Sequence, residues 1–204
     1  MTLRHGSGRA PAVFLDRDGT MIEDVGYLDR VARMSLLPWT VDAVRALNRA
    51  GLPIVMVTNQ SGIARGFLTE PIVEEIHREL IAALAAGGAT IDAYYHCPHH
   101  PNGVVAEFAR ACDCRKPARG LVDRAARDLG LDPSRSFVVG DKWVDVGLAR
   151  AVGARGILVR TGYGAGEEAR PVKGLAADAV VDNLAAAASW ILQNQEPGTR
   201  NPEP

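Results

Sequence analysis

The sequence has little net charge and no long apolar run. Its formal net charge is −1 at pH 7 over 204 residues, which gives no electrostatic reason to expect nucleic acid or an anionic membrane surface as a partner. No apolar stretch approaches the roughly 20 residues that a membrane-spanning helix needs. Residues 1–11 are polar and lack the apolar core of a secretory signal, so we expect a cytoplasmic protein that binds neither nucleic acid nor membrane.

Aromatic residues and cysteines are also scarce. Aromatic residues make up 5% of the chain, and nothing in the sequence indicates a long apolar surface stripe, so we expect a monomer. The three cysteines, an odd number, all fall in one loop-like stretch, at Cys97, Cys112 and Cys114. In a cytosolic chain, clustered cysteine and histidine residues bind a metal more often than they form disulfides.

Short apolar runs alternate with helical stripes along the chain. The runs predict buried strands, and the stripes, which end at Gly or begin at Pro, predict helices. Such alternation is typical of an α/β fold with a doubly wound parallel sheet and helices on both faces. We expect one domain over residues 12–193, with flexible tails at 1–11 and 194–204. The expected strands are 12–15, 52–57, 93–96, 136–139, 156–159 and 179–181, and the expected helices are 39–50, 69–86, 121–129, 144–152 and 184–192.

Polar side chains stand where three of these strands end. The first strand runs into Asp16, the second into Thr58 and a later one into Asp141. Because the carboxyl ends of parallel strands meet at one edge of a sheet, we expect these side chains to lie together, with the loop that carries Lys116 beside them. Arg17 directly follows Asp16, so alternation along an extended segment should turn it away from its neighbours and out of catalysis.

The residue types at this edge suit phosphate chemistry. Asp16 and Asp18 can face one substrate as a nucleophile and a general acid/base, or as two contacts to a hard cation. Together with Asp141 they could hold Mg²⁺, which prefers oxygen ligands. Thr58 and Lys116 would supply a hydroxyl and an ammonium to phosphoryl oxygens. The alternative is ordinary: an Asp-Gly turn that ends a strand, a helix cap and a solvated lysine.

The cysteine stretch has the donor set of a structural zinc site. Three thiolates and one imidazole would close a tetrahedral Zn²⁺ site with no open position. The candidate ligands are Cys97, His99, Cys112 and Cys114, with His96 and His100 as rivals for the imidazole position. The alternative is three reduced thiols in an irregular loop.

Several longer strings carry a resemblance to a known family. The Asp16-x-Asp18 pair, Thr58, Lys116 and Gly140-Asp141 are similar to the motifs of haloacid-dehalogenase-like phosphatases. The fuller strings resemble the D-glycero-D-manno-heptose 1,7-bisphosphate 7-phosphatases, and the histidinol-phosphate phosphatases share much of the pattern. The match covers about residues 12–164, and its strings are 16–20 (DRDGT), 26–27 (GY), 57–66 (VTNQSGIARG), 97–101 (CPHHP) and 112–117 (CDCRKP).

The resemblance implies a role for each matching residue. Asp16 would attack phosphorus and form an aspartyl-phosphate, while Asp18 would act as general acid and then as general base. Mg²⁺ would be held by Asp16, by the backbone carbonyl of Asp18 and by Asp141. Thr58 and Lys116 would stabilise the transferring phosphoryl group. The resemblance also favours His99 as the imidazole ligand of a structural Zn²⁺.

Substrate binding is expected from three loops, over residues 24–27, 60–65 and 98–115. Neither the segment between Asp18 and Thr58 nor that between Thr58 and Lys116 leaves room for a separate cap domain, since domains rarely fall below roughly 50 residues. A second phosphate calls for a bidentate guanidinium, for which Arg115 is our first choice and Arg65 the second. The resemblance adds the residues that complete the substrate set: Asp24, Gly26, Tyr27, Asn59, Gln60, Ser61 and Lys142.

The residues at the sheet edge predict a Mg²⁺-dependent phosphatase, and the resemblance implies that it acts on D-glycero-D-manno-heptose 1,7-bisphosphate, at the C7 phosphate, in heptose biosynthesis for lipopolysaccharide or a related glycan. A histidinol-phosphate phosphatase, or another small phosphomonoesterase, is the alternative enzyme. A non-catalytic phosphosugar-binding protein is disfavoured, because it would not need both Asp16 and Asp18. Asp145 stays open: it could orient Lys142, order the metal's water shell or be an ordinary acid at a helix start.

Overall fold

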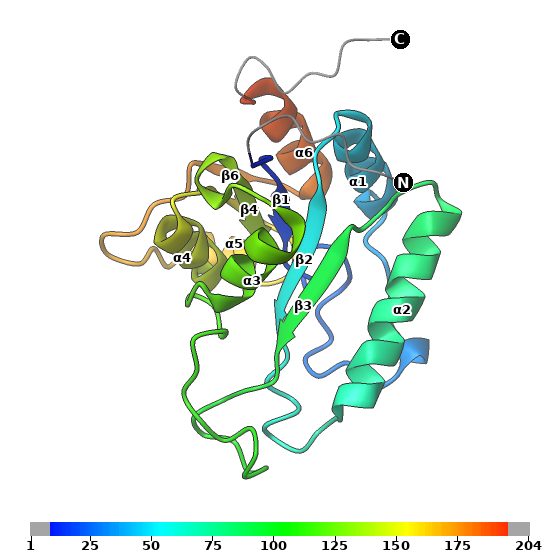
Figure 1. Ribbon diagram of the computed structural model, residues 1–204, viewed down its shortest axis with the longest axis vertical. Helices are drawn as coiled ribbons and strands as arrows, with labels where there is room; N and C mark the ends of the chain where they lie inside the picture. The colour runs from blue at the N-terminus through cyan, green and yellow to red at the C-terminus, as the bar shows by residue number, and fades with distance from the viewer. Residues whose placement is uncertain (1–8, 196–204) are drawn as a thin grey trace.

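The computed structural model describes residues 9–195, and all six strands of this part belong to one parallel sheet (Figure 1). Every neighbouring pair in the order β3-β2-β1-β4-β5-β6 is parallel. The α/β fold class predicted from the sequence is thereby confirmed. The strands are β1 Val13–Leu15, β2 Ile54–Asn59, β3 Ala93–Cys97, β4 Phe137–Gly140, β5 Arg155–Val159 and β6 Ala179–Val181.

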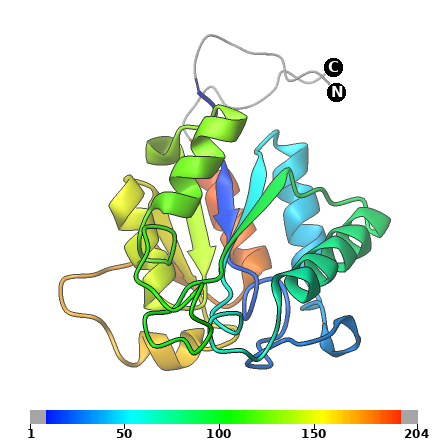
Figure 2. The same ribbon diagram turned by 60° about the horizontal axis from the view of Figure 1, so that its bottom comes forward.

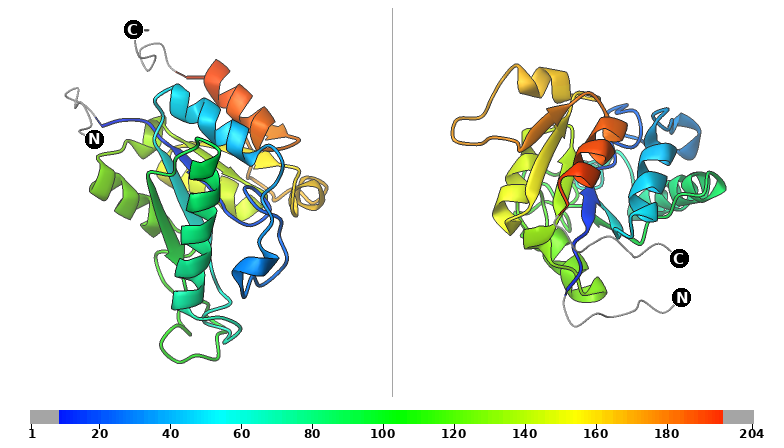
Figure 3. Two further views of the ribbon diagram at one scale, coloured as in Figure 1. Left: turned by 90° about the vertical axis from the view of Figure 1, so that its right-hand side faces the viewer. Right: turned by 90° about the horizontal axis from the view of Figure 1, so that it is seen from above.

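Helices cover both faces of the sheet, as the two further views in Figure 3 show. The helices are α1 Thr40–Arg49, α2 Glu70–Ala86, α3 Gly120–Leu129, α4 Trp143–Val152, α5 Gly164–Glu168 and α6 Leu184–Gln193, with 3₁₀ turns η1 Val31–Arg33 and η2 Pro133–Arg135. Side chains of α1, α2 and α6 form one apolar cluster with Val13 and Leu15 of β1. Those of α3 and α4 form a second cluster with Phe14, because successive strand residues point to opposite faces.

The elements expected from the sequence all occur, with ends that match or are shifted by at most two residues. Helix α5 and both 3₁₀ turns were not expected. Ala10 donates a backbone hydrogen bond to Gly130 and accepts one from Asp132, so the described fold already includes this residue. Asn194, in the other expected tail, donates from its side chain to the carbonyl of Trp190. Residues 1–8 and 196–204 of the two tails lie outside the described residues. Within 9–195, no helix is both long enough and apolar enough to span a bilayer.

The carboxyl ends of the strands point toward the end of the molecule where the long loop after β3 lies (Figures 1 and 2). In the register of the sheet, Leu15 of β1 pairs with Met56 of β2 and Val139 of β4. The chain segments that follow these strands therefore leave the sheet side by side. This edge holds the predicted site.

Candidate active site

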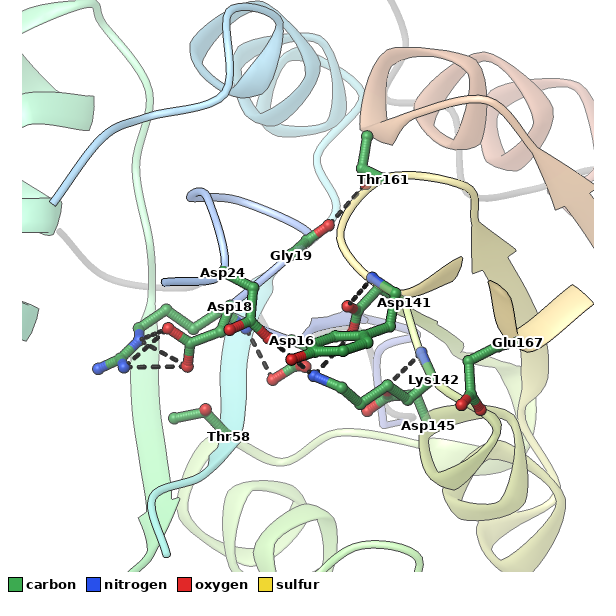
Figure 4. Close-up of polar contacts among 12 residues, drawn as sticks. Asp16, Asp18, Gly19, Asp24, Thr58, Asp141, Lys142, Asp145, Thr161 and Glu167 are labelled. Atoms are coloured by element: carbon green, nitrogen blue, oxygen red, sulfur yellow. Dashed lines mark hydrogen bonds and ion pairs between the residues drawn. The ribbon is translucent and has the colours of Figure 1, made fainter. Parts of the chain in front are cut away.

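An open cavity of about 420 Å³ lies at this edge of the sheet. Asp16, Asp18, Thr58 and Lys116 line it, and all the predicted substrate-binding residues except Arg65 line it as well. Asp141 is fully buried beside it, within 3.5 Å of the Lys142 ammonium. The structure thus brings predicted residues that follow β1, β3 and β4 to one place with those at the end of β2. Figure 4 shows Asp16, Asp18, Asp24, Thr58, Asp141 and Lys142 at this place.

Lys116 is the buried cation of the site. Its Nζ atom lies 2.8 Å from Asp16 Oδ1 and 2.6 Å from Asp145 Oδ1, and it donates a hydrogen bond of 3.0 Å to the carbonyl of Val57. Burial opposes the charge of this ammonium, but Asp145 and Asp16 outweigh burial and hold its pKa above the ordinary value. Lys116 is therefore a fixed positive charge next to Asp16.

Each carboxylate oxygen of Asp145 makes a structural contact. One carboxylate oxygen pairs with Lys116, and the other accepts a hydrogen bond of 3.2 Å from the backbone N–H of Lys142 at the start of α4. Asp145 is thus an acid at a helix start that also orients the lysine at position 116, and its contact with Lys142 is to the backbone. Burial raises the pKa of Asp145 to about 6, with Lys116 acting in the opposite direction.

The carboxylate of Asp18 is held by two neighbours. Arg17 approaches it with Nε at 3.2 Å and Nη2 at 2.9 Å, and Gln60 Nε2 donates to it at 3.0 Å. The same Gln60 amide donates to Thr58 Oγ1 at 2.9 Å, and its Oε1 accepts from Arg17 Nη2 at 3.0 Å. Asp18 and Thr58 are consequently fixed relative to each other.

The expectation that Arg17 points away from its neighbours is wrong. Its side chain is 1% exposed and contacts Asp18 directly. The extended strand ends at Leu15, and the carbonyl of Arg17 then accepts hydrogen bonds from the backbone N–H groups of Met21 and Ile22. Strand alternation cannot be applied to a residue that begins a turn.

Two carboxylates at the site suit a divalent cation. Asp16 and Asp141 belong, with Asp145, to a cluster whose ligand atoms lie within 4.8 Å of one another. Asp141 Oδ2 accepts from the backbone of Tyr163 at 2.8 Å, whereas its buried Oδ1 has no hydrogen-bond partner within residues 9–195. Burial, together with the charge of Asp16, raises the pKa of Asp141 to about 7. A cation would offset this repulsion, so the donor set fits Mg²⁺.

Glycine permits a close approach of two loops around Asp141. Gly19, after β1, has φ +78°, and a Cβ there would lie 2.2 Å from Asp141 Oδ2. A Cβ at Gly162, after β5, would lie 2.3 Å from the same atom. Thr161 ties these loops by donating from Oγ1 to the carbonyl of Gly19 at 2.6 Å. Any larger residue at positions 19 or 162 would displace Asp141.

Lys142 and Asp24 form an ion pair on the wall of the cavity. Lys142 Nζ lies 3.0 Å from Asp24 Oδ2 and 4.5 Å above the ring of Tyr163. Burial opposes the lysine charge, but the carboxylates of Asp141, Asp16 and Asp24 raise its pKa nonetheless. Asp24 Oδ1 also accepts from the N–H of Gly26 at 2.8 Å, which shapes the loop that carries Tyr27.

The remaining predicted substrate residues lie on two loops around the cavity. Asn59 exchanges two hydrogen bonds with the backbone of Lys116, at 3.0 and 3.2 Å, so it fixes that lysine's position. Ser61 follows Gln60 at the cavity wall. Arg115 also lines the cavity and reaches the carbonyl of His99, whereas Arg65 contacts His100 at 3.2 Å.

The cysteine stretch forms a compact cluster beside the cavity. The three sulfur atoms of Cys97, Cys112 and Cys114 lie 3.2–3.5 Å apart, and His99 Nδ1 is 3.3 Å from Cys114 Sγ. Hydrogen bonding to Cys97 lowers the pKa of Cys114 to about 5 against the effect of burial. These four groups could hold a zinc ion. His100 faces Arg65, and His96 faces two carboxylates of α2.

The fold and the site define a hydrolase of the HAD-like class. A family model described as HAD-hydrolase-like matches residues 113–187. Among curated proteins, the chain is 42% identical over 189 residues to the D-glycero-beta-D-manno-heptose-1,7-bisphosphate 7-phosphatase of Escherichia coli K12, with 92% of this chain and 96% of that protein covered. It is 43% identical over 196 residues to the corresponding phosphatase of Thermosynechococcus vestitus, covering 92% and 98%.

A solved structure agrees with these relatives. The D,D-heptose 1,7-bisphosphate phosphatase of B. bronchiseptica, complexed with magnesium and phosphate, superimposes with a TM-score of 0.80 at 34% identity, over 90% of this chain and 98% of that one. The chain belongs to the D-glycero-D-manno-heptose-1,7-bisphosphate 7-phosphatase family, and it is a phosphoric monoester hydrolase.

Proposed function

We propose that the chain is a cytoplasmic, Mg²⁺-dependent phosphatase that removes the C7 phosphate of D-glycero-D-manno-heptose 1,7-bisphosphate in nucleotide-activated heptose biosynthesis. The observation that carries this proposal is the pairing of two carboxylates with different surroundings in one cavity. Asp16 stands beside a buried lysine, and Asp18 stands beside a buried arginine and an amide. One carboxylate can then serve as nucleophile and the other as proton carrier.

Asp16 carries the phosphoryl group in this mechanism. Its Oδ1 accepts from the backbone N–H of Arg17 at 2.8 Å and from Lys116 Nζ at 2.8 Å, so Oδ2 is the oxygen we assign to the attack. A bond forms between Oδ2 and phosphorus while the bond from phosphorus to the C7 oxygen breaks. Asp18 donates its proton to that oxygen and later takes a proton from the water that hydrolyses the aspartyl-phosphate.

Thr58 and Lys116 stabilise the transferring group. Because Thr58 Oγ1 accepts from Gln60, its own proton is available to a phosphoryl oxygen. Lys116 adds a fixed positive charge in a buried position, where electrostatic stabilisation is strongest. Asp16, the backbone carbonyl of Asp18 and Asp141 would hold Mg²⁺, which supplies further positive charge to the phosphoryl oxygens.

The cysteine cluster in the loop over residues 97–116 positions residues of the site and takes no part in the reaction itself. We assign Cys97, His99, Cys112 and Cys114 to one structural Zn²⁺, which would fix the loop that presents Arg115 and Lys116. Arg115 is our choice for the second phosphate, with Arg65 next. The sugar would be met by the other cavity residues: Asp24, Gly26, Tyr27, Asn59, Gln60, Ser61 and Lys142. A single domain over residues 12–193, without a separate cap, leaves this cavity open.

The test is parallel turnover of heptose 1,7-bisphosphate and histidinol phosphate with saturating Mg²⁺. We expect kcat/KM to favour the heptose bisphosphate by at least about 100-fold, since a second phosphate adds charge-assisted hydrogen bonds. The Asp16→Asn variant serves as the blank and should turn over neither compound. A preference for histidinol phosphate would remove the substrate assignment, and turnover by Asp16→Asn would remove the nucleophile.

A further inference from the structure

A third group of side chains of metal-ligating types lies between α2 and β3, apart from the two clusters described above. Glu70, Glu74 and His77 are spaced four and three residues apart, so they share one face of α2. His96, near the end of β3, lies against this face: its Nδ1 is 3.6 Å from Glu74 Oε1 and its Nε2 is 3.6 Å from Glu70 Oε1. The other oxygen of Glu74 accepts from the hydroxyl of Tyr94 at 2.8 Å.

His77 brings to this group a buried ring nitrogen that has no hydrogen-bond partner among the described residues. The residue is fully buried, and its Nε2 lies 3.1 Å from Arg17 Nη1. Since a guanidinium can only donate, Nε2 accepts and the ring proton sits on Nδ1. Nδ1 is buried and has no hydrogen-bond partner within the described part of the chain. An unmet buried donor of this kind is energetically costly, so a ligand that relieves it is favoured.

The imidazole is also kept in the form that binds metals. Burial lowers the pKa of His77 to about 2, and the charges of Arg17 and His96 act in the same direction. The ring is therefore neutral throughout the physiological pH range, and a neutral ring nitrogen can coordinate an ion without competition from an added proton.

We propose that Glu74, His77 and His96 form a binding site for a divalent transition-metal ion of the zinc class. One ligand atom from each of these residues lies within 4.8 Å of the others, so small side-chain movements would place all three around one ion. Two imidazoles and a carboxylate suit Zn²⁺ and disfavour Mg²⁺, which prefers oxygen ligands. The side chains of Glu74 and Glu70 are 36% and 47% exposed, which leaves room for water to complete the coordination.

Binding of a metal ion at this site would break the hydrogen bond between Arg17 and His77. Because Nε2 of His77 faces Arg17, the ion must use Nδ1, and the ring proton then moves to Nε2. A protonated Nε2 cannot accept from Arg17, so the ion and the arginine compete for His77. Arg17 also holds the carboxylate of Asp18. If Asp18 is the proton carrier of the proposed function, an excess of zinc should therefore slow the phosphatase.

Zinc stoichiometry tests the site without using activity. With Mg²⁺ saturating, equilibrium dialysis of the full chain against Zn²⁺ should find one tight equivalent, from the cysteine cluster, and one weaker equivalent. Glu74→Gln should weaken the second equivalent by at least about tenfold and leave the tight one unchanged. Glu75→Gln, an exposed neighbour on the same helix, is the matched control and should change neither. A single equivalent, or a second one that is unaffected by Glu74→Gln, would overturn the proposal.

A second measurement needs no variant. In protein labelled with ¹⁵N at histidine, the zinc-free spectrum should show His77 as the Nδ1–H tautomer, because of the Arg17 contact. Filling the weaker zinc equivalent should shift both ring nitrogens and move the proton to Nε2. If the His77 signals stay unchanged at saturation, His77 is not a ligand and the site as proposed is wrong.

Discussion

Arg17 stands between the catalytic residues in sequence and connects Asp18 to Gln60 and His77 in space. A lysine would keep the positive charge but cannot reach all three partners with one nitrogen. We expect Arg17→Lys to lower kcat by about 10- to 100-fold with KM nearly unchanged, because Asp18 loses its fixed orientation.

Steady-state kinetics with a thermal unfolding curve check this. Arg119→Lys alters an arginine that pairs with Asp123 at the surface, and it should change neither quantity. A normal kcat in Arg17→Lys would show that the arginine serves only the stability of the fold.

The raised pKa of Asp141, about 7, predicts how Mg²⁺ binding depends on pH. Below pH 7 the ion must displace a proton, so its Kd should rise toward about tenfold for each pH unit. A carboxyl group whose folded pKa lies above its unfolded value stabilises the fold at low pH and loses that contribution as pH rises through about 7. Mg²⁺ should therefore raise the Tm more at pH 8 than at pH 6.

Calorimetric titration across this pH range, in two buffers of different ionisation enthalpy, would measure the proton release. Asp141→Asn should abolish the binding. A Kd that does not change between pH 6 and pH 8 would contradict the assignment of Asp141 as a ligand.

Residues at strand ends were predictable, and residues in turns were not. The positions of Asp16, Thr58 and Asp141 follow from where apolar runs stop, because parallel strands end at one edge. The contact of Arg17 depends on a turn whose hydrogen bonds no local pattern signals. The pairing of Asp145 with Lys116 joins residues 29 positions apart in the chain, so it required the folded structure.

At the scale of elements, burial separates the predicted strands and helices from α5, the helix that was not expected. The strands and longer helices have apolar runs or stripes that face the core. Helix α5 has the sequence GAGEE over five residues, with no apolar stripe to detect. Its Glu167 accepts from the backbone N–H of Trp143 at 2.9 Å and so supports the start of α4. The position of this short helix is therefore set by a tertiary contact and not by a local sequence pattern.

The loop after β3 should depend on its metal. Cys114 lies two residues before Lys116, so loss of zinc would release the buried lysine from its fixed position. We expect Cys112→Ala to lower kcat by roughly 10- to 100-fold and to reduce zinc content, while far-UV circular dichroism stays near that of the wild type.

Val104→Ala changes a residue of the same loop that is 79% exposed, and it should keep full activity and zinc. Full activity in a zinc-free Cys112→Ala protein would show that the loop holds its lysine without a metal.

At the scale of the whole molecule, the cavity is assembled at the carboxyl ends of β1, β2, β4 and β5 and from the segment around Lys116. Its cations belong to different segments, with Arg115 and Lys116 on the loop after β3 and Lys142 at the start of α4. The same lining holds the carboxylates of Asp16, Asp18 and Asp24, so the cavity offers separate points of positive charge and not a net positive surface. Two such points suit a substrate that carries a phosphate at each end.

A substrate with two phosphates should separate the roles of these cations. Lys116 stands beside Asp16 and would meet the reacting phosphate, whereas Arg115 lies farther along the same cavity, where it contacts the carbonyl of His99. Arg115→Met keeps the length of the side chain but removes the guanidinium. It should raise KM for heptose 1,7-bisphosphate by about 10- to 100-fold, the effect of losing a charge-assisted pair. KM for heptose 7-phosphate, which lacks the second phosphate, should stay within about twofold.

Arg65→Met is the matched comparison, since Arg65 does not line the cavity. If Arg65→Met raises the bisphosphate KM and Arg115→Met does not, the second phosphate belongs to Arg65, and the loop after β2 rather than the zinc loop selects the substrate.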